Sequence, residues 1–204
     1  MNTVKYSMSF TAGSIFFQES VKFAELYLEF GNWDETKNYI IHQNILQART
    51  LNTSKRICTE IISRLKTMNK QELEFLLDSS SQDQAYLLWL AICRRYQFIG
   101  DFAIEVIRER FISLKTDLNY IDFDSFFNQK SEWHVELENI KPSTRNKLRQ
   151  VLFKILREAD LLTENNLINV ATLSPNLIEI ICRNDKQEIL YFPLFESNLQ
   201  GMTR

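Results

Sequence analysis

The chain has 204 residues, of which 45% are hydrophobic and 25% charged, as is typical of a folded globular protein with one large or two small domains. Its formal net charge of -2 excludes a polypeptide that is basic throughout, so any nucleic-acid binding must come from a local concentration of cations. Glycine (4) and proline (3) are scarce, and no run of β-branched residues alternates with polar ones, so the chain is predicted to be mainly helical.

The cysteines and the apolar segments indicate the compartment. Cys58, Cys93 and Cys182 lie far apart with no CxxC pair, which favours reduced thiols over disulfides or a metal site. The first residues lack the apolar core of a signal peptide, and the longest apolar run, residues 85–93, is far shorter than the roughly 20 residues of a membrane span. We therefore expect a cytoplasmic protein with no membrane segment and no cofactor.

Residues 1–68 outline a helix-turn-helix. A helix over residues 15–30 is expected to end at Gly31, and the next one, with Asp34 as its cap, runs towards His42. The short segment 44–49 leads to a longer helix capped by Thr53 or Ser54, with apolar residues at helical spacing along one stripe. Short helix, turn and longer capped helix are the parts of this motif.

Residues 69–84 are predicted to form a short acidic helix and a polar loop. They separate an N-terminal region, residues 1–68, from a C-terminal region, residues 69–204, and both regions are expected to pack as one globular unit. A buried helix over residues 84–95 and a long helix over residues 101–115, beginning after Gly100, follow.

The helix-turn-helix pattern recurs in the C-terminal region. Two short helices, capped by Asp122 and Ser131, precede a long helix that Ser143 opens. Asn165 and Asn166 then lie between two short apolar segments, which predicts a β-hairpin, the wing of a winged helix.

Two elements are predicted after this hairpin. Ser174 and Pro175 begin a short helix, as cap and first helical residue. The apolar segment 188–195 is expected to be an edge strand, because Pro193 cannot donate to a ladder.

The long helix near residues 143–160 is strongly basic. Six cations precede its first acid, Glu158, and helical spacing distributes them over or beside the half opposite the apolar stripe. Arginine suits guanine edges, glutamine suits adenine, and lysine neutralises phosphate. The predicted DNA-contacting residues of this segment are Lys141, Ser143, Thr144, Arg145, Lys147, Arg149, Gln150, Lys154 and Arg157.

The alternative for the same helix is a solvated or protein-docking face. Phe153, which this spacing places on the outward side, favours docking to another protein. Charge patterning alone does not decide between the two interpretations.

A weaker basic surface lies in the N-terminal region, where Lys55, Arg56 and Lys66 are the candidate DNA contacts. Arg64 falls near the apolar stripe of the same helix and is expected to satisfy a neighbouring carboxylate.

Four further arginines leave two possibilities open. Arg94, Arg95, Arg108 and Arg110 either extend a basic surface or pair with the acids at residues 101, 105 and 109.

Catalytic and metal-binding patterns are lacking in the sequence. The two histidines, His42 and His134, have no cysteine or carboxylate at ligand spacing, and no HExxH or P-loop pattern occurs. The chain is therefore not expected to be an enzyme.

Four segments, residues 17–29, 44–65, 86–111 and 143–162, together resemble the BrxA family, small accessory proteins of bacteriophage exclusion (BREX) defence systems. The resemblance implies an all-α, cytoplasmic, helix-turn-helix protein that binds DNA, while methyltransferase and ATPase activities belong to other components. Taken with the basic helices, it predicts a non-enzymatic, monomeric protein that binds double-stranded DNA. The alternatives are an adaptor that docks other BREX proteins and, last, an RNA-binding protein.

Overall fold

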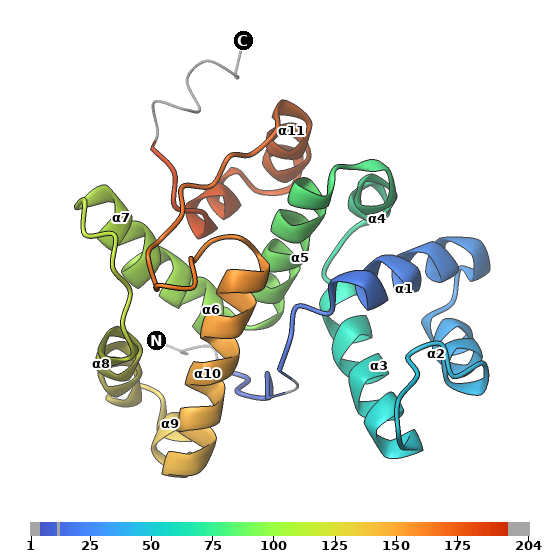
Figure 1. Ribbon diagram of the computed structural model, residues 1–204, viewed down its shortest axis with the longest axis horizontal. Coiled ribbons are helices and arrows are strands. Elements are labelled where there is room, and N and C mark those ends of the chain that lie inside the picture. Colours follow the sequence, from blue (N-terminus) through green and yellow to red (C-terminus); the bar gives the residue numbers. More distant parts are fainter. Residues whose placement is uncertain (1–4, 12, 196–204) are drawn as a thin grey trace.

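The computed structural model describes residues 5–11 and 13–195. Figure 1 shows an all-α protein in which α5 (Ser81–Arg95) lies at the centre, between the helices of the N-terminal region and those that follow it. The predicted all-α class is confirmed. Because every side chain from Ala85 to Cys93 is buried, α5 can pack against neighbours all round its axis.

The N-terminal region consists of α1 (Phe17–Phe30), α2 (Trp33–His42) and α3 (Leu51–Leu65). Gly31 ends α1 as predicted, with φ of 69° and its N–H donating to the carbonyl of Tyr27. Asp34 does not cap α2, because helical geometry already begins at Trp33, and the side chain of Asn32 accepts the first free N–H groups instead.

The start of α3 also differs from the prediction. Thr50 is its cap, three residues before Thr53 and four before Ser54, and its hydroxyl accepts the backbone N–H of Thr53. Residues 43–50 form turns rather than a helix, so α2 and α3 alone make up the helix pair.

The centre of the chain begins with α4 (Lys70–Asp78), which a capping box between Asn69 and Glu72 opens. The chain then continues through α5 into α6 (Gln97–Phe102), the π-helical segment η1 (Ala103–Arg108) and α7 (Glu109–Ile112). This run begins at Gln97, not after Gly100, because the non-helical backbone of Tyr96 is what ends α5.

The C-terminal region contains α8 (Tyr120–Ser131), α9 (Val135–Glu138), α10 (Pro142–Glu158), α11 (Pro175–Asn184) and the 3-10 helix η2 (Lys186–Tyr191). Ser174 caps α11 and Pro175 opens it, as predicted. Neither Asp122 nor Ser131 is a cap: Asn119 caps α8 with Asp122 as its capping-box partner, and Ser131 ends that helix.

The predicted late strand is wrong. Residues 186–191 form η2. In the described part of the backbone that follows, Pro193 alone is hydrogen-bonded to a distant segment: its carbonyl accepts the Ala171 N–H at 2.9 Å. The segment is apolar because Ile189, Phe192 and Leu194 are buried in the core, not because it pairs in a sheet.

The N-terminal and C-terminal regions share one apolar core. α1 packs against α4, and α3 packs against α5. The segment before α1 adds to this packing, because Tyr6 and Phe10 are buried against the ring of Phe98 on α6, and Phe10 also against Tyr96 at the α5–α6 junction. The boundary at residues 68 and 69 stays a prediction.

Candidate nucleic-acid interface

The long basic helix is α10, and its buried side is as the spacing predicts. Leu148, Val151, Leu152, Ile155 and Leu156 are all at most 2% exposed. Ser143 does not cap it: Lys141 is the N-cap residue, Pro142 is the first helical residue, and the described cap makes no side-chain hydrogen bond.

Two arginines of α10 turn towards α8 rather than to solvent. The Nε atom of Arg145 lies 3.1 Å from an Asp124 carboxylate oxygen, and its remaining N–H groups donate to the Asp124 carbonyl and the Asn128 amide oxygen. Arg149 pairs with the other oxygen of the same carboxylate. Both guanidinium groups therefore have partners inside the protein, and their side chains are only 23% and 19% exposed.

Aromatic rings of α8 support the same two guanidinium groups. Arg145 lies over Phe127 at 4.4 Å from the ring centroid, and Arg149 lies over Tyr120 at 4.6 Å. The repulsion expected within a run of cations is thus relieved by a neighbouring helix, a partner that no spacing within α10 could reveal.

Arg157, at the last turn of α10, is also occupied. It donates to the side-chain oxygen of Asn166 at 2.5 Å and lies 3.8 Å from a carboxylate oxygen of Glu164. Both partners belong to the connection that follows α10, so this arginine ties the helix to the predicted wing.

The exposed face of α10 is narrower than the helical spacing predicts. Its exposed candidates are Lys141, Ser143, Lys147, Gln150 and Lys154. Thr144 is half-buried, and Lys154 has a partly exposed i,i+4 partner in Glu158 at 3.5 Å. We name the five exposed side chains, Lys141, Ser143, Lys147, Gln150 and Lys154, the α10 stripe.

Phe153 is not on the outward side. It is 0% exposed, and its ring forms a T-shaped pair with that of Tyr120, with centroids 4.7 Å apart. The N-terminal end of α8 covers this side of α10, so the apolar residue that favoured a docking face belongs to the core instead.

The connection after α10 folds back as a short hairpin. Leu162 and Ile168 form an antiparallel bridge, and the Thr163 N–H donates to the Leu167 carbonyl at 2.8 Å. A second antiparallel bridge joins Leu167 to Asp117, before α8. Along the chain, the segment around Asp117 is followed by α8, α9, α10 and the hairpin. In the described part of the chain, the β structure consists of isolated bridges, and no extended strand forms.

The basic candidates of the N-terminal region are exposed. Lys55 and Arg56 lie on the first half of α3, and Lys66 follows its last residue. Arg64 is buried, as expected, with its Nε atom 2.9 Å from Glu60 and a bond to the Ser14 carbonyl. Figure 1 shows α3 and α10 running in the same general direction, with both N-terminal ends towards the lower edge of the view.

Two of the four further arginines, Arg94 and Arg110, pair with acids other than the ones considered from sequence. Arg94 binds Glu72 and Glu188, and Arg110 binds Asp117 and Asp122. The nearest of these four acids, Asp117, lies seven residues after its arginine, and the other three lie on other helices, so nearness in sequence was a poor guide.

Two of the three cysteines are buried in the described part of the chain. Burial raises the pKa of the Cys58 and Cys93 thiols, which makes them poor nucleophiles at neutral pH. Within residues 5–11 and 13–195, no three His, Cys, Asp or Glu side chains converge as a metal ion requires, and no helix is long and apolar enough to cross a membrane.

The sequence is similar to three BREX proteins BrxA. The protein from Paramagnetospirillum magneticum (strain ATCC 700264 / AMB-1) is 26% identical over 188 residues, 91% of this chain and 94% of its own. Those from Escherichia coli O9:H4 (strain HS) and Bacillus cereus (strain H3081.97) are 29% and 27% identical over 72% and 61% of this chain, covering 69% and 62% of their own lengths.

The fold has a counterpart of known structure. A crystal structure of an uncharacterized protein from Magnetospirillum magneticum superposes with a TM-score of 0.80, at 24% sequence identity, covering 93% of this chain and 98% of the other. At that identity the match speaks for the fold alone. The BrxA family model matches residues 4–185, nearly the whole chain, and the protein is therefore a member of the BrxA family.

Proposed function

We propose that this protein is a non-enzymatic, double-stranded DNA-binding component of a BREX phage-defence system. The observation that carries the proposal is the α10 stripe, which is exposed and contains three lysines but no acid. The family membership and the names of the relatives support the assignment to BREX.

The order of elements around α10 favours a winged helix-turn-helix mode of binding. In that mode the second helix of the pair enters the major groove with its N-terminal residues nearest the bases, and a hairpin lies beside the backbone. Here α10 would be the recognition helix, and Ser143 and Gln150 would be nearest the base edges. Lys141, Lys147 and Lys154 would neutralise phosphates.

The remaining candidates would contribute in two further ways. Lys55, Arg56 and Lys66 would bind phosphates beside α3, as a second contact. Arg145 and Arg149 already bind Asp124, so they would reach DNA only by exchanging that carboxylate for a phosphate. Thr144 and Arg157 complete the proposed surface of α10. Monomeric state and cytoplasmic location are part of the proposal.

The test is a salt titration of binding to unspecific double-stranded DNA. Each phosphate that a lysine neutralises makes the slope of log K against log salt steeper by about 0.9. Lys147→Ala with Lys154→Ala should therefore reduce the magnitude of this slope by about 2. Lysines are the better choice than Arg149 or Arg157, because replacing either arginine would also remove internal contacts.

The matched control is Lys22→Ala with Lys186→Ala, which removes the same charge from other elements. It should leave most of the slope in place. An equal loss of affinity in both double variants would mean that the effect comes from the net charge of the protein and not from the α10 stripe. Absence of DNA binding by the wild type at low salt would contradict the proposal. A duplex RNA competitor separates DNA from RNA.

A second candidate function is an adaptor that docks other BREX proteins. The supporting observation is apolar surface at the α8–α9 junction, where Trp133 and Val135 are 72% and 68% exposed. We expect an adaptor to co-purify with a partner after nuclease treatment, and to lose it on Trp133→Ser with Val135→Ser. Retention of the partner by this variant would count against docking at that surface.

A further inference from the structure

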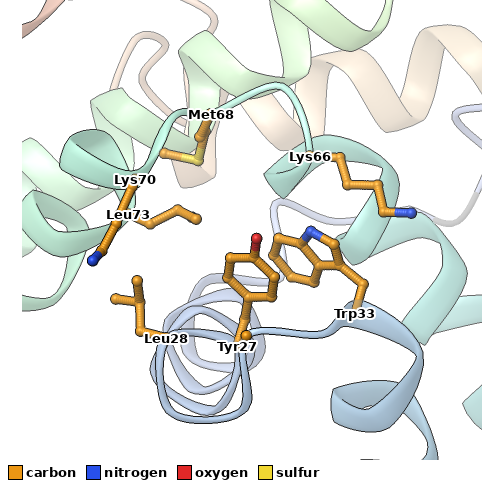
Figure 2. Close-up of a pocket in the computed structure, with 8 residues that line it drawn as sticks. Tyr27, Leu28, Trp33, Lys66, Met68, Lys70 and Leu73 are labelled. Atoms are coloured by element: carbon orange, nitrogen blue, oxygen red, sulfur yellow. The ribbon is translucent and has the colours of Figure 1, made fainter.

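A cavity of about 340 Å³ opens between α1, the beginning of α2 and the connection from α3 to α4 (Figure 2). Leu28, Met68 and Leu73 give it an apolar lining, while Lys66 and Lys70 stand at its edge. The volume is at the lower end of the range for small-molecule sites, roughly 300–1,000 Å³. None of the residues that line this cavity in the described part of the chain is acidic.

One wall of the cavity is a flat aromatic surface. The rings of Tyr27 and Trp33 stack with centroids 3.7 Å apart and planes 8° from parallel. In Figure 2 the phenol stands between the indole and the side chains of Leu28 and Leu73, so one of its faces is covered and the other looks into the cavity. An aromatic face of this kind is a stacking platform for a planar ring.

Two polar atoms of this wall lack a partner within the described residues. Among residues 5–11 and 13–195, neither the Tyr27 hydroxyl nor the indole N–H of Trp33 finds a hydrogen-bond partner, and Figure 2 shows both pointing towards the connection that carries Met68. Both groups are free to bond to a ligand.

The two lysines give the cavity a positive edge. In Figure 2 the Lys66 and Lys70 side chains lie on opposite sides of the aromatic wall. Lys66 makes no ion pair among residues 5–11 and 13–195, and Lys70 has only a loose, exposed pair with Glu74 at 3.6 Å. Positive charge, apolar lining and a flat π surface together select a ligand that is planar and anionic.

We infer that this cavity binds an unpaired nucleotide, whose base stacks on Tyr27 while its phosphate is held by Lys70, the lysine on the open side of that ring in Figure 2. The nucleotide is either free or an unpaired end of a nucleic-acid strand, since both share this chemistry. A strand end is within reach of the proposed duplex surface, because Lys66 directly follows α3, the helix of Lys55 and Arg56. The inference goes beyond duplex binding, and each can hold without the other.

The experiment uses the fluorescence of 2-aminopurine, which is quenched when the base stacks on an aromatic ring. The full chain is titrated with 2-aminopurine deoxyriboside monophosphate, with a duplex carrying 2-aminopurine in a three-nucleotide overhang, and with a blunt duplex carrying it internally. We expect quenching of the first or the second probe and none of the third. The probe that is quenched at lower concentration identifies the source of the nucleotide.

Two variants test the named contacts. Tyr27→Leu keeps apolar bulk but removes the stacking face, and should weaken binding of the quenched probe about tenfold, the usual scale for one base on one ring. Lys70→Glu, at an exposed position, should weaken it as well and keeps the test valid if Tyr27→Leu does not fold. Tyr39→Leu is the matched aromatic control, because Tyr39 is 43% exposed on α2 and does not line the cavity.

Any of the following fluorescence results would overturn the inference: no quenching of either unpaired probe, unchanged binding in a folded Tyr27→Leu or Lys70→Glu variant, or an equal loss in Tyr39→Leu. Competition by an acidic peptide without any nucleotide binding would assign the cavity to a protein partner and likewise overturn it. Binding of the blunt duplex is measured beside it and reports on the proposed function separately.

Discussion

Asp124 is the residue that decides how much of the α10 charge is available. Its carboxylate binds both Arg145 and Arg149, and it is itself about one-third exposed. The spacing of residues along α10 could not reveal this carboxylate, because Asp124 lies on α8, 21 residues before the nearer arginine.

Asp124→Asn is expected to raise the affinity for DNA at low salt by about fivefold, because one unit charge about 4 Å away in water corresponds to roughly 1 kcal/mol. The amide keeps the shape of the side chain, so the loss of stability should stay below about 1 kcal/mol, as for other partly exposed pairs. Fluorescence anisotropy with a labelled duplex measures the change. Asp78→Asn on α4 removes the same charge elsewhere; equal effects in both variants would mean that the freed arginines do not touch DNA.

Tyr96 determines a pH dependence at the junction of α5 and α6. It is fully buried, and its hydroxyl donates to Glu60 at 2.5 Å. Burial first, and this carboxylate second, raise the pKa of Tyr96 to about 12. Since the unfolded chain ionises near pH 10, its contribution to stability is complete below pH 10 and is lost as the pH rises towards 12.

We therefore expect the free energy of unfolding to fall between pH 9 and pH 11.5 by about 2 kcal/mol more in the wild type than in Tyr96→Phe, since one pKa unit corresponds to about 1.4 kcal/mol. Urea titrations at the two pH values measure it. Tyr191, whose pKa is also raised to about 12, is present in both proteins and cancels in the comparison. Identical pH profiles would show that Tyr96 ionises normally in the folded protein.

At the scale of elements, the run from α6 to α7 depends on Gly100. A Cβ atom built there lies 3.0 Å from a ring carbon of Tyr191 and 3.3 Å from the Cys93 carbonyl. The glycine sits inside a helix, where alanine would ordinarily be better by about 1 kcal/mol. Close packing of η2 against this helix is therefore the reason for glycine, rather than the helix start that its neighbours suggest.

Gly100→Ala is expected to destabilise the protein by about 1–3 kcal/mol, the usual range for overpacking. Thermal and urea denaturation measure the change. In a Tyr191→Leu background the same substitution should cost less, because the close ring carbon is gone. Gly31→Ala is a contrasting case: nothing lies within 4 Å, so its cost of about 1–2 kcal/mol comes from the left-handed backbone alone and should not depend on Tyr191.

The boundaries of the helices show the limit of local reasoning about elements. Ser174 and Gly31 were placed correctly, because the chain has one obvious polar cap or one glycine at the end of the apolar pattern. Where several possible cap residues lie close together, as at residues 50–54, the capping preference of each residue type does not decide which one is the cap. The cap is the last residue with extended backbone before the helix, here Thr50. Its position depends on where the preceding turn ends.

At the scale of the whole molecule, Arg94 joins three elements. From α5 it binds Glu72 of α4 at 2.7 Å and Glu188 of η2 at 2.6 Å, and all three side chains are at most 11% exposed. Glu188 and Glu72 overcome the effect of burial and raise the pKa of Arg94 above its usual value, so the guanidinium stays charged. The ion triad links α4 and α5 to η2, whose Glu188 lies 94 residues after Arg94.

Arg94→Ala should destabilise the protein by about 3–5 kcal/mol, because it leaves buried carboxylates without a partner. Chemical denaturation measures the effect. Arg183→Ala, which breaks an exposed pair with Glu179 on α11, is the control and should cost about 0.5 kcal/mol at most. A small effect of Arg94→Ala would mean that water or a rearranged neighbour replaces the guanidinium.

By itself, the sequence determined the helical class, most of the helices and the membership of the family, because apolar periodicity, caps and a chain-long pattern of residues are local or additive signals. It also placed Arg64 beside a carboxylate correctly. Only the tertiary structure decided that Phe153 is buried, that two α10 arginines bind Asp124, and that Tyr27, Trp33 and Lys70 meet at one cavity. Each of these depends on which other helix covers a given face, and contacts between residues distant in sequence leave no mark in the spacing along one helix.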